Sequence, residues 1–323
     1  MTILIVRIPL SEESRMSPHQ LTRYAWLSIA AALATIVLKG IAWWLTGSVS
    51  LLSDAIESFV NLAGAVMALA MLSLAARPAD HDHAFGHGKA EYFSSAFEGG
   101  LIFLAAASIA YEAVQRLLHP QPLEAIGFGL AVSVLASLIN LATARTLLSV
   151  GRRFHSITLE ADAHHLMTDV WTSVGVIVGV GLVAVTGWSW LDPAVAIIVA
   201  LNILWTGWKL LSRSAAGLMD VALPTAEIDA IEAVLVRYRA QGLSFHALRT
   251  RQAGTRAFVT LHVLAPGHWT IQQGHDWSER VESDIRQAIP RAHVTTHLEP
   301  LEDPLSMVDQ GLERRDDGPV DHG

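Results

Sequence analysis

The sequence contains no cysteine, which excludes disulfides, thiolate metal ligands and cysteine nucleophiles. Charged side chains are also scarce, at 16% of 323 residues, whereas an ordinary soluble domain has about 25%. Basic residues are fewer than acidic ones, 22 against 30, so the net charge is −8. Because phosphate binding needs clustered Lys and Arg, we expect no nucleic-acid partner.

What the chain has in excess is apolar sequence, at 52% of residues with a mean hydropathy of +0.39. A helix needs about 20 mostly apolar residues to cross a bilayer. Six segments meet this length: 24–45, 52–75, 93–116, 125–148, 160–186 and 190–212. We therefore expect a lipid-embedded, α-helical membrane domain over residues 21–215, after an N-terminal cytoplasmic segment over 1–20.

The distribution of Lys and Arg predicts the orientation of these spans. The loops after the first, third and fifth spans carry almost no basic residues, whereas the opposite loops and the N-terminal segment carry most of them. By the positive-inside rule both termini are cytoplasmic. We expect a multi-pass protein of the plasma (inner) membrane.

The last third of the chain alternates in patterns typical of a small soluble domain, which we place at 216–304. Helical spacing covers residues 225–241 and 270–289, and strand-like alternation covers 244–252, 256–264 and 293–299. The order αββαβ predicts an α+β cytoplasmic domain. Residues 305–323 are polar and acidic, and we expect them to be disordered.

Two spans each carry three polar side chains at spacings of three and four, which place them on one helix face. They are Asp54, Glu57 and Asn61 in the second span and Asp162, His165 and Asp169 in the fifth. Such residues are costly in a membrane and are functional candidates. A Glu, Asn, His and Asp from two facing helices suit Zn²⁺ or a related dication. Alternatively, the two stripes only hydrogen-bond the helices together.

Other polar residues within the spans receive less weight. Lys39 can reach the outer interface by snorkelling, and Glu98 and Glu112 lie near opposite ends of the third span. We interpret Asn140 and Asn202 as packing hydrogen bonds.

Two further groups of histidines lie outside the spans. The loop after the second span, ARPADHDHAFGHGKAEYF, contains Asp80, His83 and His87, and either binds metal or is an ordinary solvated loop. The C-terminal domain contributes a second set, which only folding could bring together. Its members are His246, His262, His275, His297 and Glu299.

Three stretches, RPADHDHAFGHGKAEYFSS, LEADAHHLMTDVWTSVGV and LRTRQAG, resemble the cation diffusion facilitator family of divalent metal transporters. The resemblance covers roughly residues 20–303. It implies a homodimer with six spans and a metallochaperone-like cytoplasmic domain, which moves Zn²⁺, Fe²⁺ and similar ions (Mn²⁺, Co²⁺, Cd²⁺) outward, often in exchange for protons. It implies no enzymatic activity and no catalytic cofactor.

The resemblance also implies roles for individual residues. The transport site would be Glu57, Asn61, His165 and Asp169, flanked by Asp54 and Asp162; the loop site would be Asp80, His83 and His87; the cytoplasmic-domain site would be His246, His262, His275, His297 and Glu299. Lys89 and Asp220 match positions of a salt-bridge cluster between subunits. The family usually has Asp or His followed by Asp where this chain has Glu57 and Asn61, which leaves the identity of the metal open.

Two other functions are compatible with metal-binding residues in a membrane protein. A membrane-embedded metalloenzyme would need a metal-bound water beside a general base, and the sequence has no HExxH motif. A membrane-anchored metal sensor would have no use for matched polar stripes in two spans. We therefore favour a transporter that works by alternating access.

Overall fold

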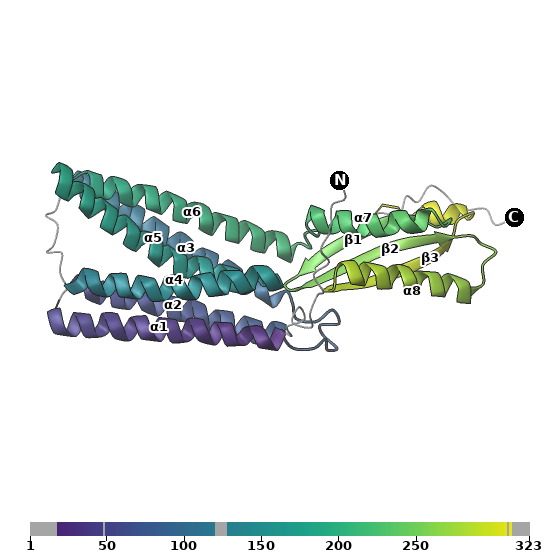
Figure 1. The fold of residues 1–323 in the computed structure, drawn as a ribbon, viewed down its shortest axis with the longest axis horizontal. Coiled ribbons are helices and arrows are strands. Elements are labelled where there is room, and N and C mark those ends of the chain that lie inside the picture. The colour runs from purple at the N-terminus through teal and green to yellow at the C-terminus, as the bar shows by residue number, and fades with distance from the viewer. Residues whose placement is uncertain (1–17, 48, 120–127, 309, 312–323) are drawn as a thin grey trace, which may run out of the picture. The chain divides into compact units, whose positions relative to one another are not determined.

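The computed structural model describes residues 18–47, 49–119, 128–308 and 310–311, which divide into two compact units between Ala216 and Gly217. Within the first unit the described residues form six long helices (Figure 1). They are α1 (Pro18–Thr46), α2 (Val49–Ala75), α3 (Ala90–Leu118), α4 (Phe128–Phe154), α5 (Ile157–Thr186) and α6 (Leu191–Leu218). All six are long and apolar enough to cross a membrane, which confirms the expected spans.

Small and large apolar residues take different places in this bundle. Ala25, Ala68 and Ala163 are fully or almost fully buried where α1, α2 and α5 pack together. Side chains such as Leu104 and Val185 are exposed on the outside. Small residues allow helix backbones to approach closely, and the outward apolar side chains suit contact with lipid.

Polar contacts hold α3 and α5 together at one end of the bundle. Ser156 is the N-cap of α5, and its hydroxyl accepts a hydrogen bond from the Leu159 amide. The same hydroxyl donates to the buried Glu91 carboxylate in the first turn of α3, at 2.5 Å. The loop of residues 76–89, which carries the histidine-rich sequence, leads directly into this turn of α3.

The second unit has the predicted αββαβ order: α7 (Thr225–Arg239), β1 (Ser244–Ala253), β2 (Arg256–Ala265), α8 (Ile271–Ala288) and β3 (Ala292–Pro300). In the described residues the sheet order is β1-β2-β3, with β1 and β2 antiparallel and β2 and β3 parallel. Gly254, at φ +59°, occupies the hairpin between β1 and β2, where a left-handed conformation favours glycine.

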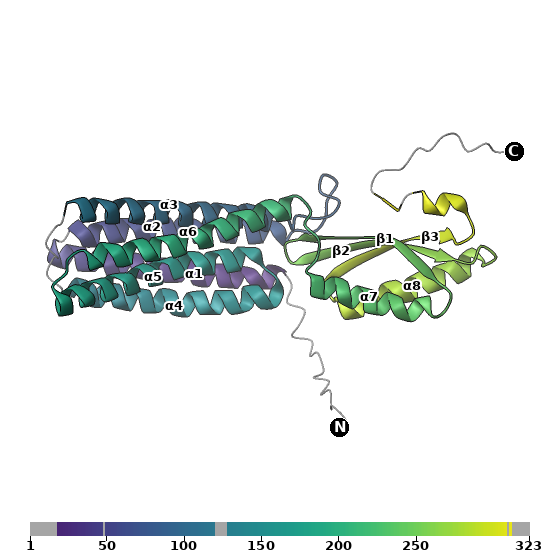
Figure 2. The same ribbon diagram turned by 90° about the horizontal axis from the view of Figure 1, so that it is seen from above.

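Both helices of this unit cover the same face of the sheet (Figure 2). Val259, Leu261 and Val263 alternate toward that face and pack with Ile231 of α7 and Val281 of α8. Because successive strand residues point to opposite faces, the residues between them, His262 among them, point to the face that the helices leave uncovered.

The C-terminal segment differs from the sequence-based expectation at its start. Residues 305–323 were predicted to be disordered, yet Pro304–Met307 form a short 3-10 helix. Asp303 caps it by accepting a hydrogen bond from the Leu305 amide, and the Ser306 hydroxyl donates to the Pro300 carbonyl. Residues 309 and 312–323 lie outside the described residues.

The buried face of α7 leads to a stability prediction. Ile231 is fully buried, whereas Val236 on the same helix is 56% exposed. We expect Ile231→Ala to lower the free energy of unfolding of the cytoplasmic domain by about 2–5 kcal/mol, because it leaves a cavity. Val236→Ala should change it by less than about 1 kcal/mol. Urea denaturation of residues 217–311 checks this, and equal losses in the two variants would contradict the packing.

Candidate metal sites

Three side chains from α2 and α5 contact one another inside the helical bundle. Asn61 on α2 donates from Nδ2 to the Asp169 carboxylate at 2.5 Å. The Nε2 atom of His165 lies 2.8 Å from Oδ1 of the same asparagine. Asn61 is 3% exposed and His165 is 4% exposed. The two polar stripes seen in the sequence therefore do meet.

A residue from a third helix joins this group. Asn140 on α4 donates from Nδ2 to Oδ2 of Asp169 at 2.9 Å, and its own Oδ1 is buried with no hydrogen bond to the described residues. The carboxylate of Asp169 thus accepts hydrogen bonds from two amides. From the sequence alone Asn140 was expected only to form a packing hydrogen bond, because spacing along one helix shows nothing about which neighbour that helix faces.

Glu57 and Asp54 lie on α2 one and two turns from Asn61 but do not join its contacts. Glu57 is exposed, although its carboxylate is close enough to Asp169 for the two charges to interact. Asp54 is half-buried, and its carboxylate lies 3.5 Å from the Ser133 hydroxyl on α4. Of the predicted transport set, the structure brings Asn61, His165 and Asp169 together, and Glu57 stays beside them.

The flanking residue Asp162 and the unassigned residue Glu98 are both fully buried. Ser28 on α1 donates to Oδ1 of Asp162 at 3.0 Å. Glu98 on α3 lies with Oε2 at 3.5 Å from Nδ1 of His165. Sequence reasoning attached no function to Glu98; its only available signal was that it is an acidic residue within an apolar span.

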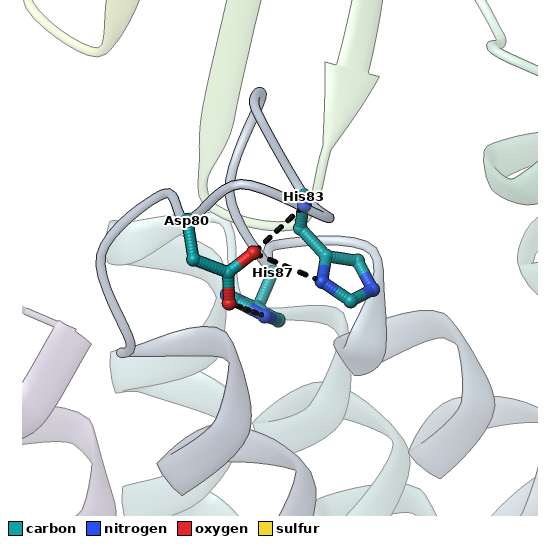
Figure 3. A group of neighbouring side chains, drawn as sticks. All are labelled: Asp80, His83 and His87. Atoms are coloured by element: carbon teal, nitrogen blue, oxygen red, sulfur yellow. Dashed lines mark hydrogen bonds and ion pairs between the residues drawn. The ribbon is translucent and has the colours of Figure 1, made fainter.

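The loop between α2 and α3 brings Asp80, His83 and His87 together (Figure 3). Oδ1 of Asp80 accepts the His83 amide at 2.7 Å and lies 3.2 Å from the Nδ1 atom of that residue, while Oδ2 lies 3.2 Å from Nε2 of His87. Gly86, at φ +81°, makes the turn that returns the chain toward Asp80. One carboxylate and two imidazoles are ligands that suit Zn²⁺ and its neighbours.

The electrostatics of the loop favour an ionised carboxylate. The hydrogen bond from the His83 amide lowers the pKa of Asp80 below its usual value, with smaller contributions from the imidazoles of His83 and His87. Because the pKa is lowered, the carboxylate keeps its charge to a lower pH than an ordinary Asp. Protons would therefore compete with a metal ion at this residue only in more acidic solution.

In the cytoplasmic domain three histidines form a row across the uncovered face of the sheet. His246 on β1 pairs in register with His262 on β2, which pairs with His297 on β3. Two residues further along β3, the buried Glu299 places Oε2 3.1 Å from both Nε2 of His246 and Nδ1 of His262. His297 lies 3.6 Å from the other carboxylate oxygen. His246, His262 and Glu299 converge closely enough to hold one ion.

Three other predicted residues are not part of these groups in the described chain. His275 is exposed on α8, which covers the opposite face of the sheet from the histidine row. Lys89 precedes α3 as its N-cap residue. Asp220 has a left-handed backbone, and its carboxylate lies 3.2 Å from Nη1 of Arg251.

Both units of the chain match known protein families. Residues 25–219 match the family described as cation efflux transmembrane domain, and residues 223–301 match the cation efflux protein cytoplasmic domain. The chain belongs to the cation efflux, or cation diffusion facilitator, family. It is therefore a multi-pass cation efflux transporter with a cytoplasmic C-terminal domain, not an enzyme.

Its relatives include transporters that match over nearly their whole length. An uncharacterized transporter, sll1263, from Synechocystis sp. is 56% identical over 283 residues, which are 88% of this chain and 91% of that relative. The cation-efflux pump FieF of Salmonella arizonae is 31% identical over 294 residues, 91% and 96% of the two chains. FieF of Klebsiella pneumoniae is 31% identical over 280 residues, 86% and 92%.

The histidine row predicts metal binding by the cytoplasmic domain alone. We expect His262→Ala to weaken Zn²⁺ binding to residues 217–311 by more than the roughly 10–100-fold that loss of a supporting residue costs, because His262 is central in the row. His268→Ala is the matched control, since His268 is an exposed histidine outside the row. Calorimetric titration distinguishes them. Equal affinity in both variants would show that the row is not a metal site.

Proposed function

We propose that this transporter exports divalent transition-metal ions of the Zn²⁺ and Fe²⁺ class from the cytoplasm across the plasma (inner) membrane, as a homodimer, in exchange for protons. The observation that carries the proposal is the contact of Asn61, His165 and Asp169 inside the bundle. Nitrogen and oxygen donors from two helices form the kind of set that binds a first-row dication. The match of residues 223–301 to the cytoplasmic, dimer-forming domain of cation efflux proteins supports the homodimer.

In this proposal the metal replaces hydrogen bonds that the ligands now make to one another. The imidazole Nε2 of His165, the amide oxygen of Asn61 and the carboxylate of Asp169 turn from one another to the ion. Glu57, one helical turn from Asn61 and near Asp169, supplies the fourth ligand. Rocking of α2 and α5 within the bundle then exposes the ion first to the cytoplasm and next to the outside.

Proton exchange follows from the same ligands. A histidine or carboxylate must be deprotonated to bind metal, so protons compete with the ion. Histidine is suited to this exchange because its ordinary pKa lies near 6.5. Protons that enter from outside displace the metal and leave toward the cytoplasm, so an inward proton gradient drives export.

The loop and cytoplasmic-domain groups have a regulatory role in this proposal. Both lie outside the six spans, so neither can carry an ion through the bilayer. Metal bound to the group of His246, His262 and Glu299 would respond to the cytoplasmic metal level. Within one chain that group supplies three ligands. A fourth ligand would come from His297, from solvent or from His275 of a second chain.

A pair of adjacent histidines tests the transport site. We expect His165→Ala to reduce Zn²⁺ flux into proteoliposomes to background, because it removes a ligand from the centre of the group. His164→Ala should retain flux, since His164 is only half-buried and takes no part in the described contact with Asn61. The measurement is Zn²⁺ flux into proteoliposomes for both variants, each checked for intact dimers by size-exclusion chromatography. Flux at the wild-type rate in His165→Ala would refute the site.

Asn61→Asp tests whether Asn61 is a ligand. The variant places a second carboxylate against Asp169, and two carboxylates in contact disfavour joint ionisation. We expect a proton to remain between them until metal displaces it, so the rise of Zn²⁺ transport with pH should move to higher pH. The ratio of Zn²⁺ to Fe²⁺ transport should change as well. Flux is measured from about pH 6 to 8. Superimposable profiles for both metals would exclude Asn61 and favour Asp54 as the partner of Glu57.

A further inference from the structure

Glu98 is a buried acidic residue that the proposed transport set does not use. It is fully buried on α3, and neither carboxylate oxygen makes a hydrogen bond to the described residues. Burying such a group costs free energy unless a partner compensates. A carboxyl group kept in this position without a hydrogen bond needs an explanation from its neighbours.

The backbone of α2 leaves space for this carboxyl group. A Cβ atom built on Gly64 would lie 2.6 Å from Oε1 and 2.9 Å from Oε2 of Glu98. Any larger residue at position 64 would therefore push the carboxyl group away. Gly64 lies on the same helix as Asn61, so α2 shapes the space for Glu98 as well as carrying a proposed ligand.

The imidazole of His165 contacts Asn61 through one ring nitrogen and faces Glu98 with the other. Its Nε2 atom lies 2.8 Å from Oδ1 of Asn61. Its Nδ1 atom lies 3.5 Å from Oε2 of Glu98 and makes no hydrogen bond to the described residues. Because the two nitrogens lie on opposite edges of the ring, an ion on Nε2 would be out of reach of a carboxylate that faces Nδ1.

We propose that Glu98 is a positioning residue of the transport site, which accepts the Nδ1–H of His165 and so leaves Nε2 bare for the metal. A metal-ligating histidine almost always donates its other N–H to a carboxylate, a carbonyl or water, which fixes the tautomer and the ring orientation. The inference rests on the proposed function, since it gives His165 the role of ligand.

The experiment compares full-length variants in proteoliposomes with Co²⁺ as probe. Glu98→Met keeps the size of the side chain without an oxygen acceptor, and Glu98→Gln keeps an oxygen. Gly64→Ala displaces the carboxyl group without changing it. Gly100→Ala on α3 is the matched control, because a Cβ there meets no atom within 4 Å. His165→Ala identifies which part of the Co²⁺ absorption spectrum comes from this site.

We expect Glu98→Met to raise the KM for Co²⁺ transport by about 10–100-fold, with a smaller change in maximal rate. It should also alter the His165-dependent part of the Co²⁺ spectrum. Glu98→Gln should bring the KM and the spectrum part of the way back to those of the wild type. Gly64→Ala should change the KM and the spectrum in the same direction as Glu98→Met. Gly100→Ala should match the wild type in both. A residue that only fills space would show no difference between Met and Gln.

The spectrum, the KM and the flux distinguish an error about Glu98 from an error about the transport site. If His165→Ala removes the Co²⁺ signature while Glu98→Met, Glu98→Gln and Gly64→Ala keep the wild-type spectrum and KM, then Glu98 does not position His165, although the transport site stands. If His165→Ala leaves the spectrum and flux unchanged, the site itself is wrong. Should Glu98→Met fail to fold, Gly64→Ala and Glu98→Gln decide the question.

Discussion

Inside a membrane a polar side chain finds little water, so its hydrogen bonds must come from other helices. In this protein Asn61, His165 and Asp169 meet that requirement by bonding to one another across α2 and α5. Asn140 extends the contact to α4. The packing of the central helices and the chemistry proposed for the site therefore depend on the same few atoms.

This arrangement has a consequence for transport. In the proposed mechanism an ion that enters the site breaks the bond between Asn61 and Asp169, so binding exchanges helix–helix contacts for ligand–metal contacts. When the ion leaves, the amide and the carboxylate can bond to each other again. The amide of Asn61 and the carboxylate of Asp169 then have a partner in both states, which limits the energetic cost of alternating between them.

Much of the architecture was predictable because it follows from local pattern. Apolar runs of sufficient length gave the six spans, and alternation in the last third gave the αββαβ order. The contact of Asn61 with His165 and Asp169 was also predictable, because spacings of three and four align residues on one helix face. Each of these features can be predicted from the residue pattern within single helices or strands.

The parts that sequence reasoning missed depend on which faces of the elements meet. Glu98 is one of three acidic residues on α3 and has no charged partner at a spacing of three or four, so only the space over Gly64 and the edge of His165 give it a context. His275 looked like a partner of the strand histidines, yet α8 lies on the other face of the sheet. The short helix after Asp303 needed a cap and a contact to the Pro300 carbonyl, which composition does not show.

The three groups differ in how ready they are for an ion, and the difference suits the roles proposed for them. In the loop and in the cytoplasmic domain, a carboxylate and two imidazoles already place their candidate ligand atoms within 4.8 Å of one another. In the bundle, Asn61 contacts Asp169, but Glu57, the proposed fourth ligand, is exposed and makes no hydrogen bond to Asn61 in the described chain. A preorganised site holds an ion tightly, because little must be rearranged. A site that must first bring in a ligand gives up part of that affinity, and a transporter needs this loss, since an ion held too tightly is never released.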